Sequence, residues 1–431
     1  MIRANWLRLA ALVLAFGLVA AACGDSDDDA DVGTDTTAAT ETTAGTETTA
    51  APETTAAAET TAAGGAAGPL AGVCPETVVF QTDWNPEAEH GALYEMVGKE
   101  GYTIDASNFI VTGDLVSGGE DTGVDIEVRT GGPAIGFQQV TAQMYQDTSI
   151  HFGYVSTDEA IENFQELPTI SVVAPLDKNP QIIMWDPATY PDVETIADLQ
   201  ENNTTIRYFE TATYMPYLLA SGQVTEGQLD GSYDGTPAVF VSEGGAIAQQ
   251  GFASAEPYIY ENEIPEWGKP VAFQLIHDTG YELYTQALGV RADAFEELTP
   301  CMELLVPIVQ QASVDYITNP EASNALILEA VNEYDNGWIY SQGVADFSVE
   351  QQLELGLVGN GSDDTLGNFD EARVQEVIDI TTRDVFPDLS GMTVQDIVTN
   401  EFIDPSIGLA ASSTTAPTTG GGEATTTSAA E

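Results

Sequence analysis

The chain has 431 residues, with 10 Lys and Arg against 69 Asp and Glu, which gives a formal net charge of −59 at pH 7. A surface this acidic repels polyanions, which argues against nucleic acid and anionic lipid headgroups as partners. With three His and neither a C-x-x-C nor an H-E-x-x-H motif, the sequence predicts no metal, no cofactor and no catalytic residue.

The first 23 residues have the order of a secretion signal. Arg3 and Arg8 precede the apolar run 9–16, and the small residues that follow this run end at Cys23. The apolar run is too short for a stable membrane span. A cysteine directly after small residues resembles the lipobox of bacterial lipoproteins. We predict that residues 1–23 end in a lipidated Cys23 that anchors an extracytoplasmic protein to the outer face of the bacterial cell membrane. An ordinary cleaved signal peptide is the alternative.

Two low-complexity segments flank the rest of the chain. Residues 24–72 and 406–431 consist mainly of Thr, Ala, Gly, Ser and acidic residues, with repeats such as TETTA. They contain almost no apolar side chain larger than Ala, so burial cannot offset the entropy cost of folding. We expect a disordered tether and a disordered tail. Residues 73–405 remain, about 330 residues, which is enough for two lobes.

Short β-rich runs alternate with helical patterns along this central region. Strands are expected at Thr77–Gln81, 150–155, 169–174, Gln181–Trp185, 205–209, 238–241, 258–260 and 272–277. Helices are expected at 91–98, 134–145, 158–165, 193–201, 214–221, 245–251, 301–317, 320–342, 349–355 and 371–381. Alternation of this kind is typical of parallel sheets flanked by helices.

We therefore predict an α/β protein with two lobes. Lobe 1 is expected at about 73–176 and 273–405, and lobe 2 at about 177–272. Two crossing segments, near 175–181 and 261–273, would join them, and the late helices would pack on lobe 1.

Two cysteines remain if Cys23 is lipidated. Cys74 and Cys301 form an even pair in an exported protein, so a disulfide is predicted, with two buried free thiols as the alternative. On the loop-entropy model, closing so long a loop contributes about 5 kcal/mol.

Residues 83–94, Asp-Trp-Asn-Pro-Glu-Ala-Glu-His-Gly-Ala-Leu-Tyr, follow the first predicted strand. This stretch resembles the opening of binding proteins of bacterial ABC importers, in particular the branch for pyrimidine precursors of thiamine, with its D-W-x-P-x-x-x-H-x-x-x-Y pattern. The segments HFGYVSTDEAI, VETIADLQ and GFASAEPYIYENEI follow in the family's order. The likeness covers about residues 75–385. It implies a periplasmic-binding-protein type 2 fold, a monomer, a small-molecule ligand and an ABC permease as partner.

Two segments depart from the family's pattern. Residues 105–127 are longer and more irregular than its short strand pair, and 205–207 replace a Gly-Lys-rich strand entry. Both departures leave the ligand open.

Ligand sites in such folds lie beyond the carboxyl ends of the strands, where loops enter helices. Trp84 and Tyr94 offer aromatic faces for a flat ring, although a Trp after a strand also serves as core packing. His90 and Glu256 offer hydrogen bonds to a ring nitrogen or an amine, although His90 also suits a helix cap. The predicted ligand-binding residues are Trp84, Asn85, His90, Tyr94, Gly132, Tyr154, Ser156, Thr211, Thr213, Tyr214 and Glu256.

The resemblance favours a flat nitrogen heterocycle as ligand, such as a thiamine pyrimidine precursor or a riboflavin-like compound. The alternative is a small sulfonate, taurine or nitrate, which relatives in the superfamily bind through helix N-termini. A pyrimidine-precursor synthase is disfavoured because the chain has no cysteine-rich motif. A surface interaction protein is disfavoured by the two-lobe α/β pattern.

Overall fold

The computed structural model describes residues 68–410. Cys23, most of the predicted tether and most of the predicted tail lie outside these residues. The fold extends beyond the predicted 73–405 at both ends. Leu70, assigned to the tether, is fully buried, and its N–H donates to the Thr122 carbonyl at 3.0 Å. Leu409, assigned to the tail, has a carbonyl that accepts from the Asn360 side chain at 2.9 Å. A leucine in each segment supplies apolar surface that the flanking repeats lack.

Seven strands form the first sheet, in the order β2-β3-β4-β1-β5-β12-β6. They are β1 (Thr77–Gln81), β2 (Thr103–Asp105), β3 (Ile110–Ser117), β4 (Glu120–Arg129), β5 (Phe152–Val155), β6 (Thr169–Val173) and β12 (Ala287–Arg291). β1 runs parallel to β4 and β5, whereas β12 runs antiparallel to β5 and β6. The carboxyl ends of β1, β4 and β5 therefore meet at one edge, where the next residues of each chain segment are brought together.

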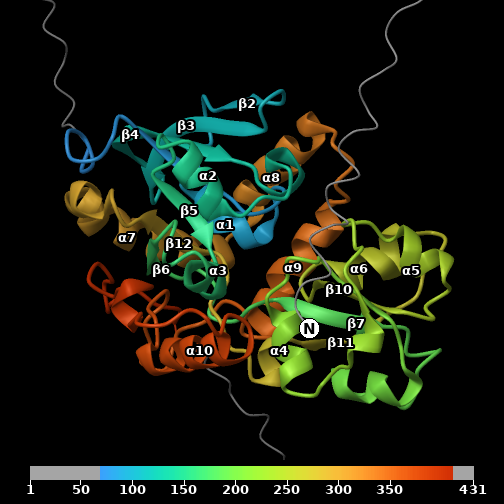
Figure 1. Cartoon of the computed structure of the whole chain (residues 1–431). Coiled ribbons are helices and arrows are strands. Elements are labelled where there is room, and N and C mark those ends of the chain that lie inside the picture. Colours follow the sequence, from blue (N-terminus) through green and yellow to red (C-terminus); the bar gives the residue numbers. More distant parts are fainter. Residues whose placement is uncertain (1–67, 411–431) are drawn as a thin grey trace, which may run out of the picture. The chain divides into compact units, whose positions relative to one another are not determined.

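Five strands form the second sheet, in the order β11-β7-β10-β8-β9. They are β7 (Gln181–Trp185), β8 (Ile206–Arg207), β9 (Leu229–Asp230), β10 (Ala248–Phe252) and β11 (Ala272–Leu275). The chain reaches this sheet between β6 and β7, at residues 174–180. It returns between β11 and β12, at 276–286, so the predicted crossing at 261–273 is wrong. The predicted crossing includes the start of β11, but β11 pairs with β7 and so belongs to the second sheet. The chain returns to the first sheet only after this strand. Figure 1 shows β7, β10 and β11 grouped apart from β3, β4, β5 and β12.

Ten α-helices and several short helical turns accompany the sheets within residues 68–410. The α-helices are α1 (Gly91–Glu95), α2 (Val140–Gln146), α3 (Thr157–Glu162), α4 (Tyr214–Ala220), α5 (Ala238–Ser242), α6 (Glu256–Tyr258), α7 (Phe295–Thr318), α8 (Glu321–Tyr334), α9 (Gln342–Glu354) and α10 (Glu371–Asp384). The 3-10 turns are η1 (Ala88–His90), η2 (Gly132–Ile135), η3 (Ile196–Asn202), η4 (Glu226–Gln228), η6 (His277–Thr279) and η7 (Val394–Asp396), and η5 (Ile259–Glu263) is a π-helical turn.

The late helices contact elements of both sheets, which corrects the prediction that they pack on lobe 1 alone. α7 and α8 contact α1 beside the first sheet. α9 contacts η1 on one side and α6 on the other, and α10 contacts both α3 and α4. The C-terminal third therefore joins the two halves of the fold (Figure 1).

Three short elements differ in type from their prediction. Residues 238–241 form α5 instead of a strand, because Pro237 provides a helix start for a run whose β-branched residues suggest a strand. Residues 258–260 are helical as well. Residues 245–251 enter β10 instead of forming a helix, since Gly244 and Gly245, with φ of 62° and 78°, make a turn that a helix does not contain.

The segment 105–127, predicted to be longer and more irregular than a short strand pair, contains most of the long hairpin β3–β4, whose register shifts between Asp114 and Val116. Gly118 and Gly119 form its turn, with φ of 55° and 81°. Positive φ at both central residues is what a tight hairpin turn demands, and the Gly-Gly pair meets this demand without strain. The hairpin extends the first sheet at one edge.

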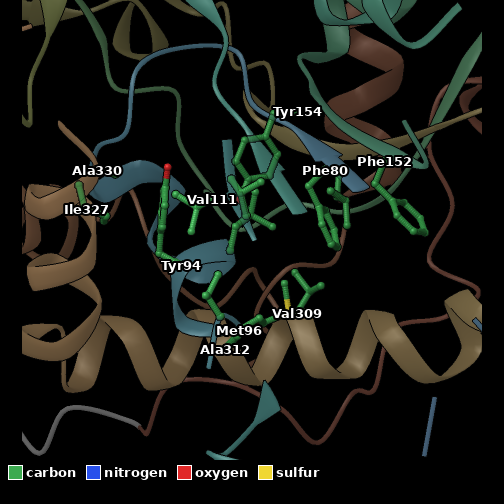
Figure 2. Close-up of a cluster of buried hydrophobic side chains, with 14 of the residues drawn as sticks. Phe80, Tyr94, Met96, Val111, Phe152, Tyr154, Val309, Ala312, Ile327 and Ala330 are labelled. Carbon is green, nitrogen blue, oxygen red and sulfur yellow. The ribbon is translucent and has the colours of Figure 1, made fainter. Parts of the chain in front are cut away.

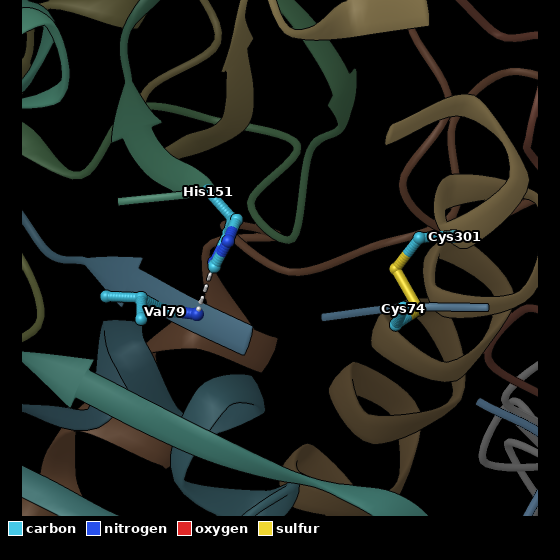
Figure 3. The surroundings of a disulfide bond; sticks show 4 residues. All are labelled: Cys74, Val79, His151 and Cys301. Atoms are coloured by element: carbon cyan, nitrogen blue, oxygen red, sulfur yellow. Dashed lines mark hydrogen bonds between the residues drawn. A yellow bond between two sulfur atoms is a disulfide. The ribbon is translucent and has the colours of Figure 1, made fainter. Parts of the chain in front are cut away.

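The first sheet is covered by the apolar faces of α1 and α7. Figure 2 shows Tyr94 and Met96 with Val309 and Ala312 of α7 in this core. The predicted disulfide is confirmed: Cys74 and Cys301 are joined, with Cα atoms 4.7 Å apart. It ties the residues before β1 to α7 (Figure 3).

Candidate ligand-binding site

Two adjoining pockets lie where residues of the first sheet face residues of the second. The aromatic pocket, of about 200 Å³, is lined by Trp84, Phe209, Tyr233, Trp338, Glu87 and Glu256, among others. The polar pocket, of about 250 Å³, is lined by Gln138, Ser156, Asp158, Glu159, Thr211 and Thr213, among others. Asp83, which follows β1, and Gln250, in β10, line both. Loops after the carboxyl ends of strands thus build the site, as the fold class predicts.

Aromatic rings from four parts of the chain surround the aromatic pocket. The Trp84 ring lies 5.8 Å from that of Phe209 and 6.0 Å from that of Trp338, centroid to centroid. Tyr233 lies a further 4.9 Å from Phe209. Trp84 follows β1, Phe209 follows β8, and Trp338 lies between α8 and α9. Such a group of rings suits a flat ring or an organic cation.

Gly132 lets the Trp84 ring approach the loop after β4. A Cβ at Gly132 would lie 2.7 Å from the indole, and the residue has a φ of 54°. Gly132 therefore positions Trp84 and is not itself in the lining of either pocket.

One carboxylate oxygen and one indole N–H in the aromatic pocket have no hydrogen-bond partner among the described residues, so a ligand can bond to them. Glu87 is buried, and its Oε1 has no hydrogen-bond partner among residues 68–410. Burial, followed by the nearby charge of Glu89, raises the pKa of Glu87 well above its usual value. The indole Nε1 of Trp338 also has no partner in this described region. A ligand that both donates and accepts would satisfy the two groups.

Glu256 is half-buried in the same pocket, at the start of α6. Its carboxylate accepts a hydrogen bond from the Phe252 N–H at 2.6 Å. Burial is the main cause that raises the Glu256 pKa to about 7. The side chain is therefore close to its titration point at neutral pH, where a cationic partner would favour the ionised form.

His90 acts on the site through Asp83. The imidazole is fully buried, and its Nε2 lies 2.9 Å from the Asp83 carboxylate. Gln286 donates to both oxygens of that carboxylate at 3.1 Å. His90 lines neither pocket, whereas Asp83 lines both, so His90 and Gln286 orient the carboxylate that a ligand would meet.

Three other predicted residues lie behind the site. Asn85 is buried and accepts from the Asn336 side chain at 2.7 Å, which ties the β1 loop to the segment carrying Trp338. Tyr94 and Tyr154 are buried in the core of the first sheet, and neither lines a pocket (Figure 2). Tyr94 lies on α1, whose buried face turns toward α7 and α8 instead of the pockets.

The polar pocket contains the remaining predicted residues, Ser156, Thr211, Thr213 and Tyr214. The Thr213 hydroxyl donates to the Asp158 carboxylate, which links the loop before α4 to α3. Among the described residues, neither pocket has a lysine or an arginine in its lining. The pockets therefore repel anions unless the carboxylates are protonated.

Gln250, like Gln181, is a polar residue of the second sheet that lines both pockets. Its side-chain oxygen accepts from the Phe209 N–H at 2.7 Å and from the Tyr214 hydroxyl at 2.9 Å. Two donors on the oxygen fix the orientation of the amide, so the NH₂ group is the end left for a ligand. Tyr214 thus acts on the site through Gln250.

Sequence reasoning missed Asp83, Phe209, Gln250 and Trp338. Asp83 opens the motif that contains Trp84, and this position was the available signal. Gln250 was hidden because residues 245–251 were predicted as a helix. Trp338 lies between α8 and α9, but the helix predicted over 320–342 includes this position, so no loop was expected there.

Residues 68–410 contain no cluster of His, Cys, Asp and Glu that could hold a metal ion. In the same part of the chain, the helices are too short or too polar to cross a membrane.

No protein-family model and no curated protein matches the sequence. A solved structure from Bordetella bronchiseptica RB50 is 12% identical, with a TM-score of 0.50, over 76% of this chain and 96% of that one. The periplasmic aliphatic sulphonate-binding protein SsuA of Escherichia coli is 12% identical, with a TM-score of 0.46, over 74% and 96%. A Candida albicans protein described as having the generic periplasmic binding protein fold is 10% identical, with a TM-score of 0.41, over 77% and 98%.

At these identities the likeness shows the fold alone. Together with two sheets joined by two crossing segments, it confirms the predicted two-lobe α/β architecture, and the assignment to periplasmic binding proteins, type 2, stays a prediction from the resemblance.

Proposed function

We propose that this chain is the extracytoplasmic, lipid-anchored solute-binding protein of an ABC importer, and that it captures a flat, amine-bearing nitrogen heterocycle. The two sheets with their helices act as two lobes that close around the ligand, and a permease recognises the closed form. Cys23 holds the protein near that permease. The protein acts as a monomer and changes no covalent bond in its ligand.

The observation that carries the choice of ligand is the lining of the aromatic pocket. Trp84, Phe209, Tyr233 and Trp338 offer aromatic faces, and the carboxylates of Glu87 and Glu256 lie in the same lining. A ring nitrogen or exocyclic amine can donate to these carboxylates, while the ring packs on the indole of Trp84. This combination suits a thiamine pyrimidine precursor or a related aminated ring.

The chemistry of the lining disfavours a sulfonate or nitrate. The described lining has neither Lys nor Arg to balance the charge of such an anion. The helix starts of α3 and α4 in the polar pocket both lie beside the Asp158 carboxylate, which is in the first turn of α3 and accepts from the Thr213 hydroxyl before α4. An added anion would meet that negative charge.

Isothermal titration of the mature protein against a 4-aminopyrimidine and an alkyl sulfonate tests the proposal. We expect the aminopyrimidine to bind with release of heat and without turnover, and the sulfonate to bind at least tenfold more weakly. Tighter binding of the sulfonate would overturn the ligand class, and conversion of either compound would overturn the transport role.

A further inference from the structure

The polar pocket is larger than the aromatic pocket, and the proposed ring leaves it unused. The two cavities share five lining residues, namely Asp83, Gln181, Phe209, Gln250 and Phe252. A ring that packs on Trp84 therefore has a second cavity of about 250 Å³ beside it. A substituent on the ring can enter that cavity without leaving the site.

The polar pocket is lined by groups that pair with alcohols. Ser156 precedes α3, yet its side chain makes no capping hydrogen bond to that helix. Thr211 adds a second hydroxyl in the loop after β8, and it is exposed toward solvent. Asp158 is buried, and its carboxylate accepts from the Glu159 N–H at 3.0 Å and from the Thr213 hydroxyl, one on each oxygen, which leaves one further lone pair on each. Alcohol groups donate and accept, so they match hydroxyls and carboxylates alike.

The charge of the polar pocket restricts the substituent to a neutral one. The carboxylates of Asp83, Asp158 and Glu159 line it, and no Lys or Arg of the described residues does. The Thr141 N–H and hydroxyl donate to Glu159 at 2.8 and 2.9 Å, and burial raises the pKa of Glu159 to about 8, so this group is mainly neutral near pH 7 and the negative charge of the pocket does not depend on it. A phosphate or carboxylate on the substituent would face these groups with no cation to balance it.

Gln250 stands at the junction of the two cavities. Its oxygen is held by the Phe209 N–H and the Tyr214 hydroxyl, so its NH₂ group is the end available to a ligand. An amide donor at this point suits an acceptor at the base of a ring substituent, such as a ring carbonyl or an ether oxygen.

We infer that the polar pocket binds a neutral hydroxylated substituent, so that the ligand is a nitrogen ring carrying a sugar or a polyol, as in a nucleoside. This inference rests on the proposed function, because it requires the ring to occupy the aromatic pocket. The bare ring then fills only part of the site, and the phosphorylated compound is rejected.

Titration calorimetry of the mature protein with two matched series tests the inference. One series is cytosine, cytidine and cytidine 5′-monophosphate, for a cyclic sugar. The other is lumichrome, riboflavin and riboflavin 5′-phosphate, for an open polyol. In at least one series we expect the hydroxylated member to bind about tenfold or more tightly than the bare ring, and the phosphate to bind more weakly than the hydroxylated member.

Variants separate the two pockets. Thr211→Val and Ser156→Ala should each weaken binding of the hydroxylated member several-fold and leave binding of the bare ring unchanged. Trp84→Ala should weaken both. Ser242→Ala, on α5 and outside both pockets, is the matched control for Ser156→Ala and should change neither. Melting temperatures of all variants check that the fold is retained.

The outcomes distinguish the inference from the proposed function. If the bare ring binds as tightly as its hydroxylated partner in both series, or if a phosphate binds best, the second pocket has another role and the ring proposal survives. If Thr211→Val weakens the bare ring and the hydroxylated member equally, the inference also fails. If none of the six compounds binds, the inference fails, and the titration with a 4-aminopyrimidine decides separately whether the ring proposal stands.

Discussion

Trp84 contributes to the site through its indole ring, whose centroid is 5.8 Å from that of Phe209 and 6.0 Å from that of Trp338, and which packs against Gly132. Trp84→Ala should remove the stacking surface and about 2–4 kcal/mol of binding free energy for the heterocycle. Affinity would then fall roughly 30- to 1,000-fold, since each 1.4 kcal/mol is about tenfold. Titration calorimetry measures the loss, and Trp84→Phe, which keeps a ring, should recover much of it. An affinity within about twofold of wild type in Trp84→Ala would show that the indole serves packing alone.

Glu256 should make binding and stability depend on pH in opposite directions. Its pKa is raised from 4.5 to about 7, with burial as the main cause, so the folded state keeps a proton that the unfolded state loses. Between these two values the folded protein binds more protons, and stability of the ligand-free protein therefore falls as pH rises. Affinity for an amine-bearing ligand should instead rise through pH 7, because the ionised carboxylate pairs with the amine.

Glu256→Gln isolates this contribution. The variant should lose the rise in affinity near pH 7 and show a weaker decline in stability between pH 4.5 and 7. Glu261→Gln, an exposed carboxylate five residues later, is the matched control and should behave as wild type. Calorimetry and urea unfolding across this pH range make both measurements, and identical pH profiles for Glu256→Gln and wild type would contradict the assignment.

The sequence allowed part of the site to be predicted, and the parts it missed have a common physical reason. Trp84, Ser156, Thr211 and Glu256 line pockets because loops after parallel strands meet at one edge. Tyr94 has the spacing of the motif, yet α1 turns its side chain into the core. Spacing along the chain indicates which residues lie near one another. It does not indicate which way a helix face points, because that depends on the elements that pack against the helix.

At the scale of elements, the hydrophobic pattern predicted the type of secondary structure correctly where a run was long and regular. Gln181–Trp185, for example, is the strand β7 as predicted. Short runs were ambiguous. The AVFV run became α5 because Pro237 starts a helix there, and the GGAIAQQG run became the entry to β10 because two glycines turn the chain. For runs this short, the end residues decide the element more than propensity does.

The disulfide is the element whose effect on stability is easiest to predict. Cys74 and Cys301 close a loop with a sequence separation of 227 residues. Replacing both by Ser should lower the free energy of unfolding by about 2–5 kcal/mol, chiefly because the unfolded chain gains freedom. Urea unfolding of the wild type and the double variant, each with and without reductant, measures this. Reductant should lower the stability of the wild type to that of the variant and leave the variant unchanged; equal stability of all four samples would contradict the prediction.

At the scale of the whole fold, contacts between the two halves decide how readily the site closes. The Thr213 hydroxyl of the second half donates to Asp158 of the first, and Ser254 after β10 donates to Glu89 of η1. Burial raises the Glu89 pKa, and the Ser254 hydroxyl partly offsets this. These bonds hold the two sheets in the arrangement that forms both pockets. A ligand that contacts both halves adds to the same equilibrium.

Thr213→Val should therefore shift the ligand-free protein toward an open arrangement without unfolding either half. Small-angle X-ray scattering should give a larger radius of gyration for the variant than for wild type, and saturating ligand should remove the difference. Only the closed arrangement binds the ligand tightly. Affinity should therefore fall by the same factor as the closed fraction of the ligand-free protein. Thr225→Val removes a hydroxyl that bonds only within its own loop, to Gln228, and serves as the control. If the variant's radius and affinity both equal those of wild type, the Thr213–Asp158 bond does not contribute to closure, and the pockets are held open or closed by other contacts.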